Sequence, residues 1–169
     1  MADLDSAIAA QRRAAADFKT AALRVSDSLW NVPRAPGKWS PAQVTDHVGL
    51  STRVAHDFMD EKPNMGNLPF FLRPVLRYFF MRPVLKKGFP KKGKGPSIFA
   101  PAHDPMPRDQ LCARIDTEVA ALEADARAMV NSGKVEFTHS FFGRMAVSDY
   151  VQFNALHFDH HREQLPVGQ

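Results

Sequence analysis

The sequence has one cysteine, Cys112, so the chain cannot form an internal disulfide. No apolar run comes near the length of about 20 residues that a membrane-spanning helix requires. Residues 1–18, MADLDSAIAAQRRAAADF, begin with acidic residues and lack the apolar stretch of a signal peptide. These absences argue against a disulfide-stabilised secreted scaffold and an integral membrane protein, and we therefore expect a cytoplasmic protein.

Acidic residues are missing from residues 62–94, and this absence accounts for the basic net charge. The segment contains nine lysines and arginines, whereas the whole chain has a formal net charge of +4. The remaining residues therefore sum to −5. Any argument from positive charge about nucleic acid, membranes or acidic substrates thus concerns this one segment.

The length of 169 residues, with 44% hydrophobic and 24% charged residues, is typical of a single globular domain over residues 1–169. Apolar residues at three- and four-residue steps predict amphipathic helices over residues 3–30, 40 to about 60, 107–132 and 148–165. The second helix has a clear start, with Ser40 as N-cap, Pro41 at the first position and Gln43 closing a capping box. No segment shows a convincing strand pattern, so we expect an all-α four-helix bundle.

Residues 61–106 form a long crossover between the second and third predicted helices. A connection of this length can carry the chain from one end of a bundle to the other, which leaves those helices parallel. It is rich in proline, lysine and phenylalanine, and Pro74 and Pro83 are expected to break it into one or two short helical turns. Its basic and aromatic residues fit a lid over a site, a cap on the bundle, or a surface for acidic membranes or nucleic acid. We favour the first two interpretations, so neither nucleic acid nor membrane is an expected partner.

Histidines are concentrated in the stretch NALHFDHHREQL, residues 154–165. His157 and His161 fall on the inward face of the last predicted helix, whereas His160 falls at the edge of that face. His47 falls on the core face of the second helix. Buried imidazoles need polar partners, and one divalent metal would serve all three. Three neutral imidazoles suit zinc, nickel, iron or copper, and three protein ligands leave a coordination position open.

Other polar residues near this face allow alternatives. Tyr150 and Asn154 share the histidine face and could orient a substrate or a ligand, or could form a hydrogen bond in the core. Asn154 or His160 could also be a fourth ligand of a closed, purely structural site. Asp46 adjoins a candidate ligand but points away from it, so we expect a helix-capping or surface role, and His139 could line the mouth of a pocket. No residue stands out as a general acid or base, so the catalytic residues remain unknown.

The stretches GKWSPAQVTDHV, residues 37–48, and FFGRMAVSDYVQFNALHFDHHREQL, residues 141–165, resemble the DinB-like superfamily, also described as DinB/YfiT-like metalloenzymes. The closest likeness is to a branch of small bacterial proteins, and it covers nearly the whole chain. The resemblance implies a four-helix bundle with up-down-down-up topology. It also implies a metal site with one histidine from the second helix and two, four apart, from the last. Carried over, these ligands are His47, His157 and His161, and the Arg162 and Gln164 that follow fit the family's pattern.

The resemblance also suggests classes of activity. Relatives include S-transferases that use bacillithiol and a mycothiol-dependent isomerase, and others are described as hydrolases. It therefore implies a metal-dependent enzyme, with zinc or nickel, acting on a small-molecule substrate as a hydrolase or as a small-thiol S-transferase with a low-molecular-weight thiol as cofactor. Relatives often dimerise, so a homodimer is expected. The alternative is a non-catalytic, metal-stabilised bundle whose basic aromatic crossover binds an anionic partner or surface.

Overall fold

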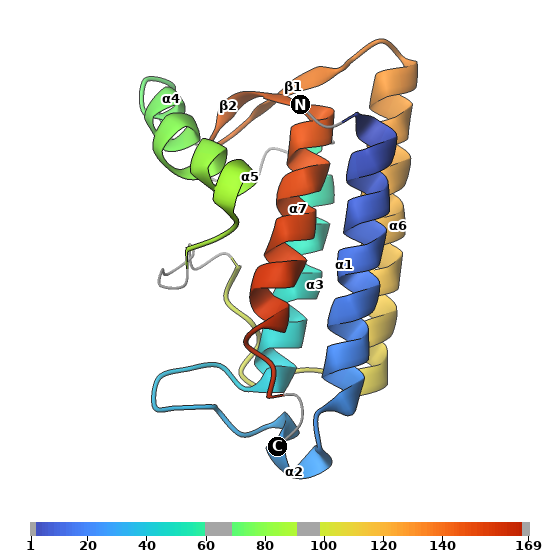
Figure 1. The fold of residues 1–169 in the computed structure, drawn as a ribbon, viewed down its shortest axis with the longest axis vertical. Helices are drawn as coiled ribbons and strands as arrows, with labels where there is room; N and C mark the ends of the chain where they lie inside the picture. The colour runs from blue at the N-terminus through green and yellow to red at the C-terminus, as the bar shows by residue number, and fades with distance from the viewer. Residues whose placement is uncertain (1–2, 60–68, 91–98, 167–169) are drawn as a thin grey trace.

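The computed structural model describes residues 3–59, 69–90 and 99–166, and most of them are helical. Four long helices lie side by side (Figure 1): α1 (Leu4–Arg24), α3 (Pro41–Met59), α6 (Arg108–Asn131) and α7 (Val147–Arg162). Along the long axis of the molecule, α1 and α7 run in one direction and α3 and α6 in the other. The expected largely helical fold is confirmed. None of the described helices is long and apolar enough to cross a membrane.

The helix starts follow local capping chemistry. The predicted capping box is present at α3, where the Gln43 N–H donates to Ser40 Oγ at 3.2 Å and the Ser40 N–H donates to Gln43 Oε1 at 3.1 Å. The first predicted helix is too long, because the chain is extended at Val25 and restarts as the short α2 (Asp27–Trp30). Ser26 is the N-cap of α2, a position that serine favours over a helix interior.

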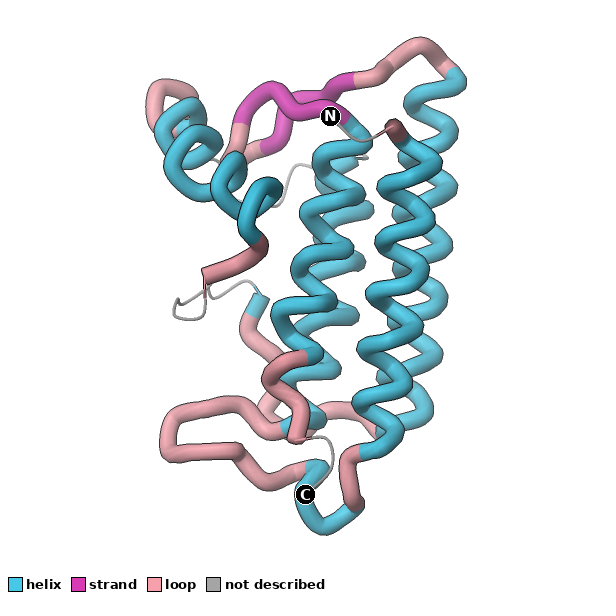
Figure 2. Tube along the Cα trace, viewed as in Figure 1, coloured by secondary structure: helices cyan, strands magenta, loops and turns pink. Residues whose placement is uncertain are grey.

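A β-hairpin precedes α7, so the expectation of a fold without strands is wrong. β1 (Glu136–His139) pairs with β2 (Gly143–Ala146) in an antiparallel register that places Phe137 opposite Met145. The hairpin lies at the end of the molecule where α6 ends and α7 begins (Figure 2). Strands of four residues are too short for an alternating pattern to stand out from the sequence.

The described part of the crossover is more regular than expected. The segments α4 (Arg73–Leu76), η1 (Arg77–Met81) and α5 (Arg82–Lys87) follow one another without a break, so the prediction that Pro74 and Pro83 interrupt the helix is wrong. Pro74 lies in the first turn of α4, where its missing N–H is tolerated. The wider π-turn before Pro83, in which the Arg82 N–H donates to the Arg77 carbonyl, is a local adjustment that accommodates the second proline. Lys62, Lys91, Lys92 and Lys94 lie outside the described residues.

The core is built mainly where α1 meets α7 and α3 meets α6. Phe18 of α1 and Phe158 of α7 are fully buried and pack edge to face, with ring centroids 6.0 Å apart. Near the hairpin a second apolar cluster includes Leu122, Met145 and Val151. This packing holds α3 and α7 at fixed positions relative to each other, and the candidate site lies between them.

Candidate metal centre

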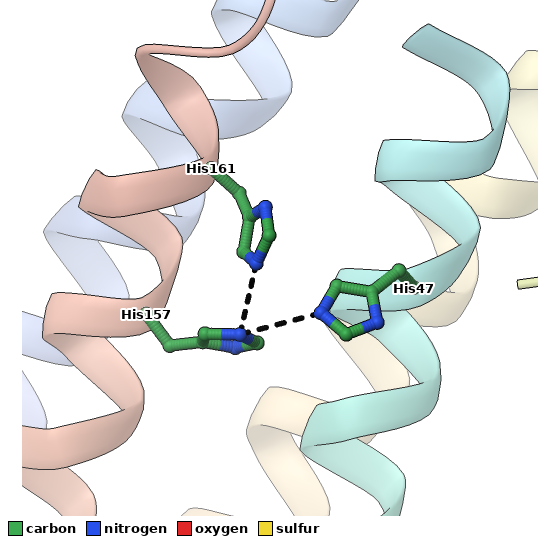
Figure 3. Close-up of side chains that lie close together, drawn as sticks. All are labelled: His47, His157 and His161. Atoms are coloured by element: carbon green, nitrogen blue, oxygen red, sulfur yellow. Dashed lines mark hydrogen bonds between the residues drawn. The ribbon is translucent and has the colours of Figure 1, made fainter. Parts of the chain in front are cut away.

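The structure brings together three histidines from two helices. His47 comes from α3, and His157 and His161 lie one turn apart on α7 (Figure 3). His157 Nε2 lies 3.0 Å from His161 Nε2 and 3.4 Å from His47 Nε2. One candidate ligand nitrogen from each side chain lies within 4.8 Å of the other two. Within the part of the chain that the structure describes, the cluster consists of these three histidines and includes no carboxylate or thiol.

The cluster is shielded from solvent, and this burial keeps the imidazoles neutral. His47 and His161 are buried and His157 is half-buried. Loss of solvation lowers the pKa of His161 to about 3, with the neighbouring His47 and His160 acting in the same direction. The same cause lowers the pKa of His157 well below its usual value and lowers that of His47 as well. Neutral imidazole is the form that offers a lone pair to a metal.

The hydrogen bonds of the cluster leave one conflict that a cation would remove. The Nδ1 of His47 donates to the carbonyl oxygen of Phe99, so in the neutral ring Nε2 carries the lone pair. His157 Nε2 can donate its single proton to only one of the two Nε2 atoms beside it. At least one of the two Nε2–Nε2 contacts therefore cannot be a hydrogen bond. A metal ion would instead accept a lone pair from each of the three histidines.

The spacing of the nitrogens also fits a metal. Nitrogens at about 2.0–2.1 Å from a tetrahedral zinc lie roughly 3.3–3.4 Å from one another. The two separations that involve His157, 3.0 and 3.4 Å, are close to this value, and all three nitrogens lie within 4.8 Å of one another. The three side chains thus fit a divalent transition metal in both chemistry and geometry.

A group of contacts next to His47 was not predicted. Asp46 is 6% exposed and binds Ala102 and Arg114, so the expected helix-capping or surface role is wrong. Its Oδ2 accepts the Ala102 N–H at 2.7 Å, and its Oδ1 accepts a bond from Arg114 Nη2 of α6 at 2.6 Å. Together with the His47–Phe99 bond, these contacts attach residues 99–102 to α3 through two successive side chains. A helical wheel could not reveal this arrangement, because it shows on which face of the helix a side chain lies but not which residue of another segment it contacts.

Aromatic rings lie next to two of the three clustered histidines. The Trp39 ring lies 4.7 Å from the His47 ring, measured between centroids. Phe89, just after α5, lies 5.2 Å from the His157 ring and 5.5 Å from the His160 ring. The crossover therefore contributes at least one side chain to the surroundings of the site.

The other candidate residues lie in two different places. His160 adjoins the cluster, with its ring 4.9 Å from that of His161, and Gln164 Nε2 donates to its Nε2 at 3.0 Å. Asn154 donates instead to the backbone carbonyl of Tyr150 at 3.1 Å. The Tyr150 ring packs against Phe137 and His139 in the core beneath the hairpin.

Comparison with known proteins gives one match. A family model described as the DinB superfamily matches residues 10–165, a range that contains all three histidines. No curated protein and no solved structure matches the chain.

Proposed function

Because this chain belongs to the DinB superfamily, a family of metal-binding proteins, we propose that it is a metal-dependent enzyme with His47, His157 and His161 as ligands. The observation that carries the proposal is the convergence of three neutral imidazoles, from helices remote in sequence, on one buried point. The fold that we propose is a single-domain, up-down-down-up four-helix bundle. The directions of α1, α3, α6 and α7 in Figure 1 support that topology.

Zinc or nickel is the proposed metal, since both accept three imidazole ligands. When bound, such an ion supplies a Lewis acid that polarises a substrate and lowers the pKa of a thiol or of water. The Phe99 carbonyl orients the His47 ring, and Trp39 and Phe89 exclude water and offer apolar contact to a small substrate.

Transfer to a small thiol is the reaction that we favour. Hydrolysis usually needs a general base to take a proton from water, but Asp46, the carboxylate next to His47 in the chain, is bound to Arg114 and Ala102. A thiol starts from a pKa of about 8.5, far below that of water, so the same metal leaves more of it deprotonated at neutral pH, and its sulfur is itself the nucleophile. The sulfur would attack an electrophilic carbon of the substrate as the leaving group departs with its electron pair. A metal-dependent hydrolase is the second candidate.

Elemental analysis of the protein, purified without an affinity tag, tests the metal site. We expect about one equivalent of zinc or nickel per chain, lost in His157→Ala and retained in the control His103→Ala, an exposed histidine. Absence of metal in the parent, with none taken up on incubation, would contradict the proposal. Turnover of electrophiles with bacillithiol or mycothiol, abolished by chelation, then separates the transferase from a hydrolase and from a non-catalytic bundle.

A further inference from the structure

Large exposed apolar side chains are concentrated on one short part of the crossover. Six of the eleven that the structure shows lie between residues 70 and 79, whereas the others are scattered. We call these six the aromatic tip: Phe70, Phe71, Leu72, Val75, Tyr78 and Phe79. Phe70 is 79% exposed and Phe79 is 73% exposed. Contiguous exposed apolar groups of this kind mark interaction surfaces more often than isolated ones do.

The fold itself does not use the aromatic tip. The opposite side of the same helical stretch provides the packing, with Met81 and Val84 buried. Phe80 also points inward, and its ring centroid lies 6.2 Å from that of Phe142 and 6.3 Å from that of Phe153. The stretch is therefore anchored by one side while the other remains apolar and exposed.

Positive charges accompany the tip. Residues 69–90 contain five cations, Arg73, Arg77, Arg82, Lys86 and Lys87, and no acidic residue. Arg82 and Lys86 are exposed, and the Arg82 guanidinium lies over the Tyr78 ring at 5.8 Å. The helical stretch stands out from the side of the four long helices (Figure 1), so a planar surface can reach it.

We propose that residues 69–87 bind the surface of an anionic membrane. The phenylalanines of the tip would enter the headgroup region, while the flanking arginines and lysines contact lipid phosphates. A symmetric contact with a second copy of the chain fits less well, because it would bring the same cations together. Nucleic acid also fits less well, because two of the six tip residues, Leu72 and Val75, offer no aromatic face for stacking on bases, whereas all six can enter a headgroup region. Sequence alone does not favour a membrane here, since it cannot show which aromatic residues the fold leaves exposed.

Sedimentation of the full-length protein with lipid vesicles tests this proposal. We expect binding to mixed phosphatidylcholine and phosphatidylglycerol vesicles, weakened by salt, and none to phosphatidylcholine alone. Phe70→Ser and Phe71→Ser should each weaken binding on the order of tenfold. Arg82→Gln combined with Lys86→Gln should weaken it roughly 30-fold. The exposed apolar control variants Leu23→Ser and Val135→Ser should bind as the parent does.

Four results would overturn the proposal. The first is no sedimentation with anionic vesicles, and the second is equal binding to neutral ones. The third is tighter binding to a DNA duplex than to vesicles, and the fourth is a dimer by light scattering that Phe71→Ser converts to monomer. Because the tip is separate from the histidines, His157→Ala should still bind vesicles, so this result is independent of the proposed metal function.

Discussion

His139 is a buried histidine that the proposed function does not use. It is 2% exposed, and its Nδ1 accepts the Phe141 N–H at 3.0 Å and the Phe142 N–H at 3.4 Å. Loss of solvation lowers its pKa to about 3, and the nearby charge of Arg73 contributes. It is therefore a core-facing residue at the end of β1, and at neutral pH it acts as an uncharged hydrogen-bond acceptor.

This burial makes stability depend on pH. Between pH 6.5 and about 3, the unfolded chain binds a proton at His139 and the folded chain does not. The contribution of His139 is thus fully present above pH 6.5 and is lost as the pH falls, by at most about 1.4 kcal/mol per pH unit. We expect His139→Asn, which keeps an acceptor but cannot be protonated, to flatten the dependence of the unfolding free energy on pH in this window.

Urea unfolding at a series of pH values, in the presence of a chelator, measures this slope. The difference between parent and variant isolates His139 from the other buried histidines. His103→Asn is the matched control because His103 is exposed. An equal change of slope in both variants, or none in His139→Asn, would contradict the prediction.

At the scale of elements, α3, α6 and residues 99–102 meet beside the histidine cluster. Arg114 of α6 donates both to Asp46 Oδ1 and to the Asp46 backbone carbonyl of α3, the latter at 2.7 Å. Gly49 leaves room for this guanidinium, since a Cβ there would lie 2.8 Å from Arg114 Nε. These contacts support the segment whose Phe99 carbonyl orients His47.

Metal affinity should therefore depend on residues that do not touch the metal. We expect Asp46→Ala to raise the dissociation constant for zinc by about 10- to 100-fold, a range typical of lost support to a ligand histidine, and Gly49→Ala to raise it less, because the flexible end of Arg114 can shift. Titration against a chromophoric chelator measures this constant directly. Asp46→Asn should have a smaller effect, because its amide oxygen still accepts the Ala102 N–H.

The exposed Asp104 provides the control for these variants, as Asp104→Ala should bind zinc like the parent. Thermal unfolding of the metal-free variants distinguishes lost affinity from general loss of folding. An unchanged dissociation constant in Asp46→Ala would show that the Phe99 carbonyl does not need this support.

At the scale of the whole molecule, the proposed metal would join α3 to α7 through three histidines that come together only in the folded chain. Free metal at 100 times its dissociation constant would stabilise the fold by about 2.7 kcal/mol. For a chain of this size, that corresponds to a rise of roughly 5 to 11 °C in melting temperature. We expect this rise in the parent and its loss in His161→Ala, measured by circular dichroism with and without chelator. The same rise in both proteins would place the metal elsewhere.

The sequence by itself determined what depends on local periodicity. The long helices, the capping box at Ser40 and the shared face of His157 and His161 all follow from side-chain spacing within one segment. The opposition of His47 to that pair was also predictable, because amphipathic helices turn their apolar faces to a common core. Three histidines on these otherwise apolar faces indicated a metal site without any knowledge of how the helices pack.

Only the tertiary structure decided which partners these elements find. Asp46 is bound by Arg114, which lies 68 residues away, and no local pattern carries that information. The hairpin strands are too short for their alternation to stand out, and helical continuity past Pro83 depends on a single π-turn. The aromatic tip is the clearest case, because Phe79 and Phe80 are neighbours of the same type, yet the fold exposes one and packs the other. Periodicity shows which side of a helix is apolar, but the packing of distant segments decides which side is covered.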